Sequence, residues 1–353
     1  MRNTPEGCHV TLPSLPVGNK TARFCIVQGG MSVRISLHKL AAAVAREGGV
    51  GTIGGMGIPP AELRREIQAA RELTDGVLGV NLMYAGYLFD RLLDVCIEER
   101  VDYVAIGAGF ARGPFKRLAE AGIPGFCIIS SVKAARIAAR TEGVTGIVVE
   151  SGQAGGHLGP EDPEISTWDL FPPVRASLRE HGFTGPIIAA GGIIDRHDVL
   201  RALAMGADGV QIGTRFAMTD ECAASEAMKA AWVGATGSQV EYWSPTGMAS
   251  RAIVPHTPDL LPKVGEPGVH CTDCLKHCQH RDEEKSHCIY NALTNAQRGD
   301  VTRGLVFCGG RVGDIHDIVP VAEIFRRLVT PLPGEEPLRA IGALAAAEEV
   351  ADL

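Results

Sequence analysis

Residues 186–215 read PIIAAGGIIDRHDVLRALAMGADGVQIGTR, and this stretch shows the unit from which most of the chain is built. It contains a strand, a Gly-Gly turn, a helix, a second strand and a Gly-Thr turn, at Pro186–Ala190, Gly191–Gly192, Arg196–Met205, Gly209–Ile212 and Gly213–Thr214. Both strands are apolar throughout, which is typical of strands buried on both faces of a parallel sheet. The stretch therefore predicts two neighbouring parallel strands joined by a helix.

The same unit recurs upstream. Six more strands are predicted, at Phe24–Gln28, Val50–Ile53, Val77–Asn81, Tyr103–Ile106, Gly125–Ile129 and Gly146–Glu150. Helices are predicted between and after the strands, at Leu37–Glu47, Pro60–Leu73, Tyr87–Glu99, Phe115–Ala121, Val132–Arg140, Leu170–Glu180 and Ala223–Ala231. Ser36, Ser131, Asp169 and Asp195 lie at helix starts and are the expected N-caps. Eight consecutive units predict an α/β fold, a closed (β/α)8 TIM barrel.

An open, doubly wound sheet is the alternative arrangement for alternating strands and helices. The first strand-to-helix turn reads Gly29-Gly30-Met31 and does not match the G-x-G-x-x-G fingerprint of dinucleotide-binding sheets. This mismatch favours the barrel.

The sequence divides into four segments. We expect an N-terminal extension at 1–20, the barrel at 21–235, a loop and Cys-rich metal-binding insertion at 236–310, and a C-terminal helix and tail at 311–353. Within the last two segments, Gln239–Val254 reads as a loop, Ile289–Arg298 and Val321–Leu328 as helices, and Leu305–Cys308 as strand-like.

Composition excludes several classes of function. The net charge is −7 with no Lys/Arg run, which argues against a nucleic-acid partner. The chain has no apolar run long enough to cross a membrane, and residues 1–20 lack the pattern of a signal peptide. A cytoplasmic protein acting on a small-molecule substrate is expected.

The glycines after the last two strands predict a phosphate site. In TIM barrels, loops after strands seven and eight often bind phosphate through backbone N–H groups, and glycine lets the backbone approach an anion closely. Gly191-Gly192 and Gly213-Thr214 stand at these two positions. Tight turns alone are the alternative explanation, but two such pairs favour phosphate binding.

A histidine follows the sixth strand on a glycine-rich loop, ESGQAGGHLG at 150–159. This places His157 at the carboxyl-terminal face of the barrel, where active sites lie. Imidazole titrates near neutral pH and suits proton transfer, although a solvent-exposed loop histidine is the alternative. Glu150, at the strand end, is expected to face a cofactor or to cap the loop.

Five short motifs in this order resemble the nitronate monooxygenase family and the related flavin-dependent enoyl-ACP reductases. They are QGGM at 28–31, GVN at 79–81, the E-x6-H loop at 150–157, AGGI at 190–193 and QIGT at 211–214. The resemblance covers about residues 20–235 and implies FMN across the top of the barrel. It implies that the flavin is contacted by Gly29, Met31, Asn81, Glu150 (where many relatives carry Gln), Gly155, Gly192, Gln211, Gly213 and Thr214. It also implies that His157 is the catalytic histidine, handling a proton at, or orienting, the reacting carbon.

Four cysteines within 18 residues form a second motif, C-x2-C-x3-C-x9-C, at Cys271, Cys274, Cys278 and Cys288. In a reducing compartment such clusters hold metal more often than they form disulfides. Zinc and a [4Fe–4S] cluster both accept four thiolates, and the single C-x2-C pair favours [4Fe–4S]. The run is locally similar to the cluster segment of 2,4-dienoyl-CoA reductase and trimethylamine dehydrogenase, with a different last spacing. Cys308 and the nearby His270, His277, His280 and His287 are further candidate ligands.

Two enzymatic functions are consistent with these features. One is an FMN-dependent oxidoreductase that takes electrons from NAD(P)H and reduces a small unsaturated or nitro substrate, with the [4Fe–4S] cluster relaying electrons to or from a one-electron partner. The other is a nitronate monooxygenase that uses O2 and has a structural metal site. A non-catalytic redox sensor is a third, weaker reading, and a homodimer is one expectation for assembly. Met56, Met83, Phe110 and the Ser244–Arg251 loop are expected to line the substrate pocket.

Overall fold

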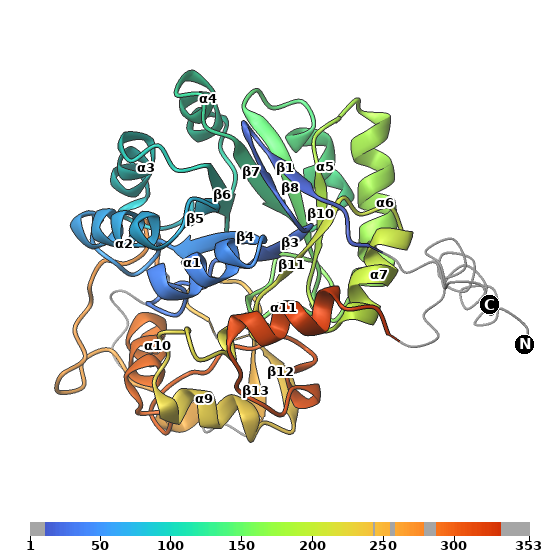
Figure 1. The fold of residues 1–353 in the computed structure, drawn as a ribbon. Helices are drawn as coiled ribbons and strands as arrows, with labels where there is room; N and C mark the ends of the chain where they lie inside the picture. Colours follow the sequence, from blue (N-terminus) through green and yellow to red (C-terminus); the bar gives the residue numbers. More distant parts are fainter. Residues whose placement is uncertain (1–10, 243, 255–257, 279–286, 333–353) are drawn as a thin grey trace, which may run out of the picture.

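The computed structural model describes residues 11–242, 244–254, 258–278 and 287–332, and at its centre is a closed parallel barrel (Figure 1). Its strands are β3 (Ile26–Gln28), β4 (Val50–Gly54), β5 (Val77–Met83), β6 (Tyr103–Gly107), β7 (Gly125–Ile129), β8 (Val144–Glu150), β10 (Ile187–Ala190) and β11 (Gly209–Ile212). The barrel closes where β11 pairs with β3, with Val210 opposite Ile26. The predicted (β/α)8 TIM barrel is confirmed, and every predicted barrel strand takes part.

Helices follow the strands around the outside of the barrel (Figure 1). They are α1 (His38–Arg46), α2 (Pro60–Leu73), α3 (Phe89–Glu98), α4 (Arg112–Glu120), α5 (Val132–Ala138), α6 (Thr167–Glu180) and α7 (Arg196–Ala204). After β11 come two helices, a four-residue α8 (Thr214–Ala217), which the sequence did not predict, and α9 (Glu226–Val233). Within the described residues, no helix is both long enough and apolar enough to cross a membrane.

Two of the four predicted N-caps are confirmed. Ser131 accepts a hydrogen bond from Ala134 N, and Asp195 forms a capping box with Asp198. The other two predictions are wrong. Ser36 hydrogen-bonds Met31 at the preceding turn, and Ser166 caps the helix in whose first turn Asp169 lies.

Aromatic side chains fill space beside glycines of neighbouring barrel strands. A Cβ on Gly79 would lie 2.0 Å from the ring of Tyr103, and one on Gly146 would lie 2.5 Å from Phe126. The two aromatic rings contact each other at a tilt of 50°, with centroids 5.0 Å apart. Tyr103 is 1% exposed, and burial raises the pKa of its hydroxyl well above the usual range. These glycines are therefore needed for barrel packing rather than for turns.

Part of the N-terminal extension is ordered against the amino-terminal end of the barrel. The strands β1 (Leu15–Val17) and β2 (Lys20–Ala22) form an antiparallel pair. Lys20 Nζ donates to Gly76 O at 3.2 Å and to Asp102 Oδ2 at 3.2 Å, just before β5 and β6 begin. Residues 1–10 of the predicted extension lie outside the described residues.

The segment predicted as a loop at Gln239–Val254 contains a hairpin. The strands β12 (Gly237–Glu241) and β13 (Ser250–Val254) pair antiparallel, and β13 also pairs with β9 (Gly156–His157). The strand-like prediction at Leu305–Cys308 is reduced to one bridge, between Phe307 and Ala252. The predicted helix at Ile289–Arg298 is present as α10.

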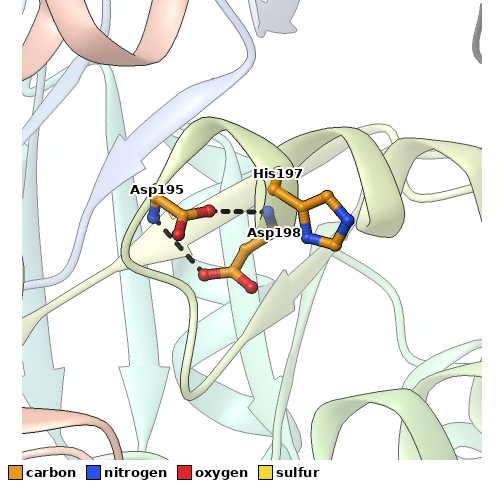
Figure 2. A group of neighbouring side chains, drawn as sticks. All are labelled: Asp195, His197 and Asp198. Carbon is orange, nitrogen blue, oxygen red and sulfur yellow. Dashed lines mark hydrogen bonds between the residues drawn. The ribbon is translucent and has the colours of Figure 1, made fainter. Parts of the chain in front are cut away.

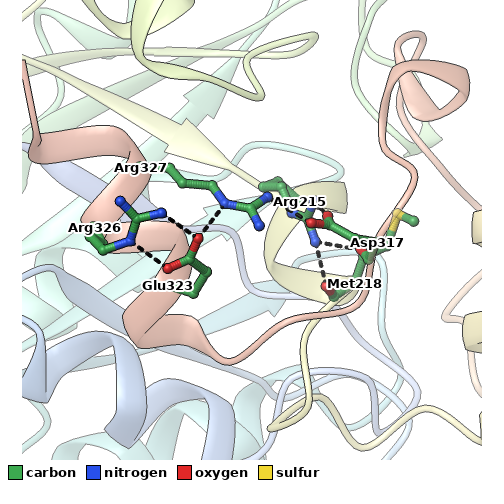
Figure 3. A network of polar contacts seen from close by, with 6 residues as sticks. All are labelled: Arg215, Met218, Asp317, Glu323, Arg326 and Arg327. Carbon is green, nitrogen blue, oxygen red and sulfur yellow. Dashed lines mark hydrogen bonds and ion pairs between the residues drawn. The ribbon is translucent and has the colours of Figure 1, made fainter. Parts of the chain in front are cut away.

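A last helix, α11 (Val321–Val329), packs against α1 and α7. Its Phe325 lies 6.2 Å from the ring of Phe24 and 5.9 Å from that of Phe216. Beside it, Arg215 of α8 donates to Asp317 Oδ1 at 2.6 Å, and Asp317 also binds Arg327 (Figure 3). The C-terminal helix therefore belongs to the barrel wall, and residues 333–353 of the predicted tail lie outside the described residues.

Candidate active site

A cavity with a volume of about 330 Å³ opens at the carboxyl-terminal ends of the barrel strands. This size is in the range of small-molecule and cofactor pockets. Every residue predicted to bind flavin or to act in catalysis lines it: Gly29, Met31, Asn81, Glu150, Gly155, His157, Gly192, Gln211, Gly213 and Thr214. The structure thus brings together residues that are up to 185 positions apart in the sequence, from Gly29 to Thr214.

One end of the cavity is built from the turns after β10 and β11. Gly191 and Gly192 adopt φ angles of +106° and +65°, which an L side chain rarely adopts. A Cβ added to Gly213 would meet no atom within 4 Å, so this turn faces open space. The space beside this backbone is open, and a methyl group on Gly213 would occupy part of it. Such open space next to backbone N–H groups is what a phosphate-binding turn requires.

Arg311, which is not among the predicted site residues, also lines this end of the cavity. Its Nη1 donates to Asp198 Oδ2 at 2.6 Å and lies 3.5 Å from Gly192 O. The residue follows the Gly309-Gly310 pair, which was the only local signal for it. It brings positive charge to the predicted phosphate end.

Asp195, His197 and Asp198 gather at the start of α7 (Figure 2). The carboxylate of Asp195 accepts from Asp198 N at 3.0 Å, and Asp198 Oδ2 accepts from Ile194 N at 2.9 Å. Both acids therefore already cap the helix, and Asp198 also binds Arg311. We assign the group to positioning the turn after β10, not to a metal.

At the other end, the turn after β3 packs tightly against β5. A Cβ on Gly30 would lie 2.3 Å from Asn81 Cβ, so only glycine fits beside this asparagine. Gly29 N donates to Ile212 O at 2.9 Å, and Met31 N donates to Ser36 Oγ at 2.9 Å. The turn is fixed by the neighbouring strand end and by the start of α1.

His157 lies on β9 rather than on a free loop, because β9 pairs with β13. Its Nε2 is 2.8 Å from Ser244 Oγ, and its ring meets Phe307 edge-on with centroids 5.4 Å apart. Burial lowers the pKa of His157 to about 4. The imidazole is therefore neutral at pH 7 and held in one orientation.

Glu150 ends β8 and lines the same cavity, and among the described residues no hydrogen bond to its carboxylate is found. Burial raises the pKa of Glu150 to about 7. Near neutral pH this group exists in both protonation states, so it can donate or accept a hydrogen bond in the cavity.

The turn at residues 307–310 covers the middle of the cavity. A Cβ on Gly155 would lie 2.6 Å from Cys308 C, so this glycine is required by the close approach of the turn. Gly309 N donates to Thr214 Oγ1 at 2.8 Å, and Trp232 Nε1 donates to Phe307 O at 2.9 Å. The C-terminal segment thereby completes a site begun by the barrel.

The four predicted metal-binding cysteines line a second, smaller cavity of about 30 Å³. Burial, with smaller contributions from the nearby Cys288, Cys278 and Cys271, raises the pKa of the Cys274 thiol to about 12. All four cysteines line this one cavity, and a cation bound there would stabilise their ionised forms.

Cys274, Leu275 and Ile289 line both cavities, so the two sites share a wall. The cysteine segment is fixed to the barrel, since Lys276 N donates to Ala85 O at 2.9 Å and Tyr87 N donates to Cys274 O at 3.1 Å. The sequence placed the two sites in separate segments and did not predict this contact.

Some predicted contributors lie elsewhere. Met56 and Met83 line the barrel cavity as predicted, and so does Thr246, which belongs to the predicted Ser244–Arg251 loop. Phe110 does not line the cavity; its ring packs against Phe115, with centroids 5.9 Å apart. Cys308 lines the barrel cavity, away from the cysteine cavity. His287 lines the cysteine cavity, and His280 lies outside the described residues.

Known proteins similar to this chain agree with the geometry. The chain is 32% identical over 207 residues to (3aS,4S,5R,7aS)-5-hydroxy-7a-methyl-1-oxo-octahydro-1H-indene-4-carboxyl-CoA dehydrogenase of Rhodococcus jostii, over 58% of this chain and 55% of that relative. It is 27% identical to a probable nitronate monooxygenase of Staphylococcus saprophyticus, over 80% of this chain and 85% of the relative. The match to the dehydrogenase thus spans just over half of its length.

Solved structures show the same fold over nearly the whole chain. FabK from Thermotoga maritima superposes with a TM-score of 0.74 at 28% identity, covering 94% of this chain and 96% of that one. Nitroalkane oxidase from Streptomyces ansochromogenes gives a TM-score of 0.69 at 22% identity, covering 93% and 98%, and supports the fold alone.

The sequence profile of nitronate monooxygenase matches residues 16–87 and 83–331, which include the barrel, the hairpin, the cysteine segment and α11. The chain therefore belongs to the nitronate monooxygenase family, whose members are FMN-dependent oxidoreductases.

Proposed function

We propose that the protein is an FMN-dependent oxidoreductase that uses NAD(P)H to reduce a small unsaturated or nitro substrate, with a [4Fe–4S] cluster on the four cysteines relaying electrons. The observation that carries the proposal is the shared wall of Cys274, Leu275 and Ile289 between the barrel cavity and the cysteine cavity. A structural metal site would not need to adjoin the cofactor cavity.

The barrel cavity fits FMN in its chemistry. The open cradle at Gly213, the left-handed Gly192 and the cation of Arg311 suit a phosphate group. Gly29, Met31 and Asn81 would contact the ring system at the other end, with Glu150, Gly155, Gln211 and Thr214 between. FMN, when bound, supplies the hydride and electron chemistry.

The residues of this chain would provide binding, orientation and hydrogen bonding. His157 is neutral, half-buried and held by Ser244, which suits a group that hydrogen-bonds the reacting part of a substrate. The turn at residues 307–310 and Trp232 would limit the access of water to the cavity.

The cysteine cavity supports a cluster better than a single zinc ion. Zinc–sulfur bonds of about 2.3 Å in a tetrahedron bring sulfurs within about 3.8 Å of one another. In the described chain, no three of the four sulfurs lie within 4.8 Å of one another. A [4Fe–4S] cluster has its own volume between the sulfurs and suits a wider arrangement.

The test is the cofactor content of full-length protein purified anaerobically. The proposal expects FMN together with about four irons per chain, and flavin bleaching by NADH or NADPH that a conjugated enoyl thioester or nitro substrate reverses. His157→Ala should retain FMN and lose turnover by about 100-fold or more. A colourless protein that takes up no FMN would contradict the proposal.

Nitronate oxidation is the second candidate, because the family profile and the Staphylococcus saprophyticus relative carry that name. Protein containing FMN and zinc that consumes O2 with alkyl nitronates, and that NAD(P)H does not bleach, would favour it over the reductive function.

A further inference from the structure

His157 stands at the end of a chain of hydrogen bonds that runs through the loop between β12 and β13. Its Nε2 lies 2.8 Å from Ser244 Oγ, and Ser244 Oγ lies 2.9 Å from Thr246 Oγ1. Thr246 N donates to Ser244 Oγ at 3.4 Å, and Met248 N donates to Thr246 Oγ1 at 3.2 Å. Ser244 is 3% exposed, so its hydroxyl depends on these partners.

The partners of the two hydroxyl groups favour one direction for this chain of hydrogen bonds. Thr246 Oγ1 already accepts from Met248 N, so its own hydrogen needs an acceptor, and Ser244 Oγ is the acceptor in reach. Ser244 then accepts from Thr246 and donates its hydrogen to His157 Nε2. Every hydrogen in the chain is used, and Nε2 is the bare nitrogen of the imidazole.

The reverse direction is less favourable. If His157 Nε2–H donated to Ser244, the serine would have to donate to Thr246 Oγ1. The hydroxyl hydrogen of Thr246 would then have no acceptor among the residues that the structure describes. Thr246 is half-buried and lines the cavity, so this hydrogen would have to bond to solvent or to a ligand instead of to the protein.

We propose that Ser244 is a positioning residue that holds His157 as the Nδ1–H tautomer, so that the imidazole donates a hydrogen bond into the cavity. Nδ1 is the ring nitrogen that makes no hydrogen bond within the described part of the chain, and His157 lines the cavity. A neutral imidazole N–H suits an oxygen that gains negative charge, such as a thioester carbonyl or a nitro oxygen.

This inference rests on the proposed function for the presence of a substrate in the cavity, but the tautomer itself does not. It also bears on the choice between the two candidate functions. A ring nitrogen that already carries its proton is a donor and not a base, so this His157 stabilises an electron-accepting substrate and does not remove a proton from carbon.

Nitrogen-15 NMR of histidine-labelled full-length protein tests the tautomer directly, because protonated and bare ring nitrogens resonate far apart. The expected spectrum at pH 7 shows His157, assigned by its loss in His157→Ala, with Nδ1 protonated and Nε2 bare. A spectrum in which Nε2 carries the proton would overturn the proposal whether or not the protein binds FMN or turns over any substrate.

Ser244→Ala tests the positioning role, and Ser250→Ala is its matched control. Ser250 lies in the same hairpin, opposite His157 in the strand pairing, and its Oγ is buried with no hydrogen-bond partner among the described residues. Ser244→Ala should mix the two tautomers and lower kcat about tenfold, with FMN content and KM near wild type. Ser250→Ala should change neither.

Ser244→Thr keeps a hydroxyl at the same position and should restore both the spectrum and the turnover. Equal loss of turnover in Ser244→Ala and Ser250→Ala would show that only hairpin packing matters and would overturn the positioning role. So would a Ser244→Ala protein that keeps one tautomer and full kcat.

Discussion

Gly213 lies where the last barrel strand turns into α8, and its Cα faces empty space. An added methyl group would touch no protein atom within 4 Å, and the φ angle of −101° suits any residue. We therefore expect Gly213→Ala to fold with a free energy of unfolding within about 0.5 kcal/mol of wild type. If the space holds the flavin phosphate, the same methyl group should weaken FMN binding about tenfold or more, measured by fluorescence titration of apoprotein.

Gly237→Ala is the matched control for this change. Gly237 begins β12, does not line the cavity, and also has no atom within 4 Å of an added Cβ. FMN affinity should remain at the wild-type value. Equal FMN affinities in the two variants would show that Gly213 does not face the phosphate.

Glu150 should make the free energy of unfolding depend on pH, and the burial of its carboxyl group determines the sign of that dependence. Its pKa is raised from 4.5 to about 7, so the folded protein holds a proton that the unfolded chain releases between these values. The free energy of unfolding of the apoprotein should fall as pH rises through this window, by on the order of 1–3 kcal/mol. Glu150→Gln cannot lose a proton and should remove this dependence.

Urea unfolding of both proteins at pH 5 and pH 8 measures the effect. We expect the Gln variant to be the more stable of the two at pH 8 and similar at pH 5. If the difference in stability between wild type and Glu150→Gln is the same at pH 8 as at pH 5, burial does not penalise the ionised form of Glu150, and the prediction is wrong.

Which site residues could be predicted from sequence depends on how each reaches the cavity. Gly192, Gly213, Glu150 and His157 follow barrel strands, and the carboxyl ends of parallel strands always converge. Arg311 lines the cavity from an irregular segment after the barrel, and Ser244 contacts His157 from the loop between β12 and β13. Periodicity contains no information about where such segments fold back, so Arg311 was missed. Ser244 belongs to the Ser244–Arg251 loop that was predicted to line the substrate pocket, but its contact with His157 was not predicted.

At the scale of elements, the segment that leads into α11 is joined to α8 through a charged pair, Arg215 and Asp317. Arg215 is buried and donates to Asp317 Oδ1 at 2.6 Å (Figure 3). Burial alone would raise the pKa of Asp317, but hydrogen bonds from Arg327 and Arg215 hold it below its usual range. The ionised Asp317 therefore stabilises the folded protein above about pH 4, and this stabilisation is lost as pH falls through the depressed pKa.

Asp317→Asn should lower the free energy of unfolding by about 1–3 kcal/mol at pH 7, because it leaves the buried Arg215 without a counter-charge. Chemical denaturation followed by circular dichroism measures this loss. Glu323→Gln, which removes a carboxylate from the exposed ion pairs with Arg326 and Arg327, is the control and should have a smaller effect. Equal stability of Asp317→Asn and wild type would contradict the assignment.

The strands that could be predicted from the sequence are buried, whereas the strand β12, which was not predicted, is half-exposed. The barrel strands are apolar on both faces, and most of their boundaries were predicted within two residues. The strand β12 is half-exposed along its whole length and carries no alternating apolar face, so it read as a loop. The helix α8 was missed because it is a single turn, too short for any helical period.

The molecule as a whole combines two sites that the chain encodes more than 50 residues apart. The last barrel turn is at Gly213-Thr214 and the first cysteine of the motif is Cys271, yet the two cavities share Cys274. Pro245 lines the cysteine cavity, while its neighbours Ser244 and Thr246 contact His157 and the barrel cavity. A change at the four-cysteine cavity is therefore expected to reach His157 through one short turn.

Cys271→Ser and Cys274→Ser separate the two roles of the cysteine segment. Cys271 is exposed and lines the cysteine cavity alone, whereas Cys274 lines both cavities. Each variant loses one of four thiolate ligands, so iron content should fall in both, measured on anaerobically purified protein.

The flavin absorption spectrum should shift in Cys274→Ser and stay close to wild type in Cys271→Ser. Cys96→Ala, in the buried core of α3, should retain full iron content. Unchanged iron content in Cys271→Ser, or no iron in the wild-type protein, would mean that the four sulfurs do not hold a cluster. Either result would rule out electron transfer through a cluster but would not contradict FMN binding in the barrel.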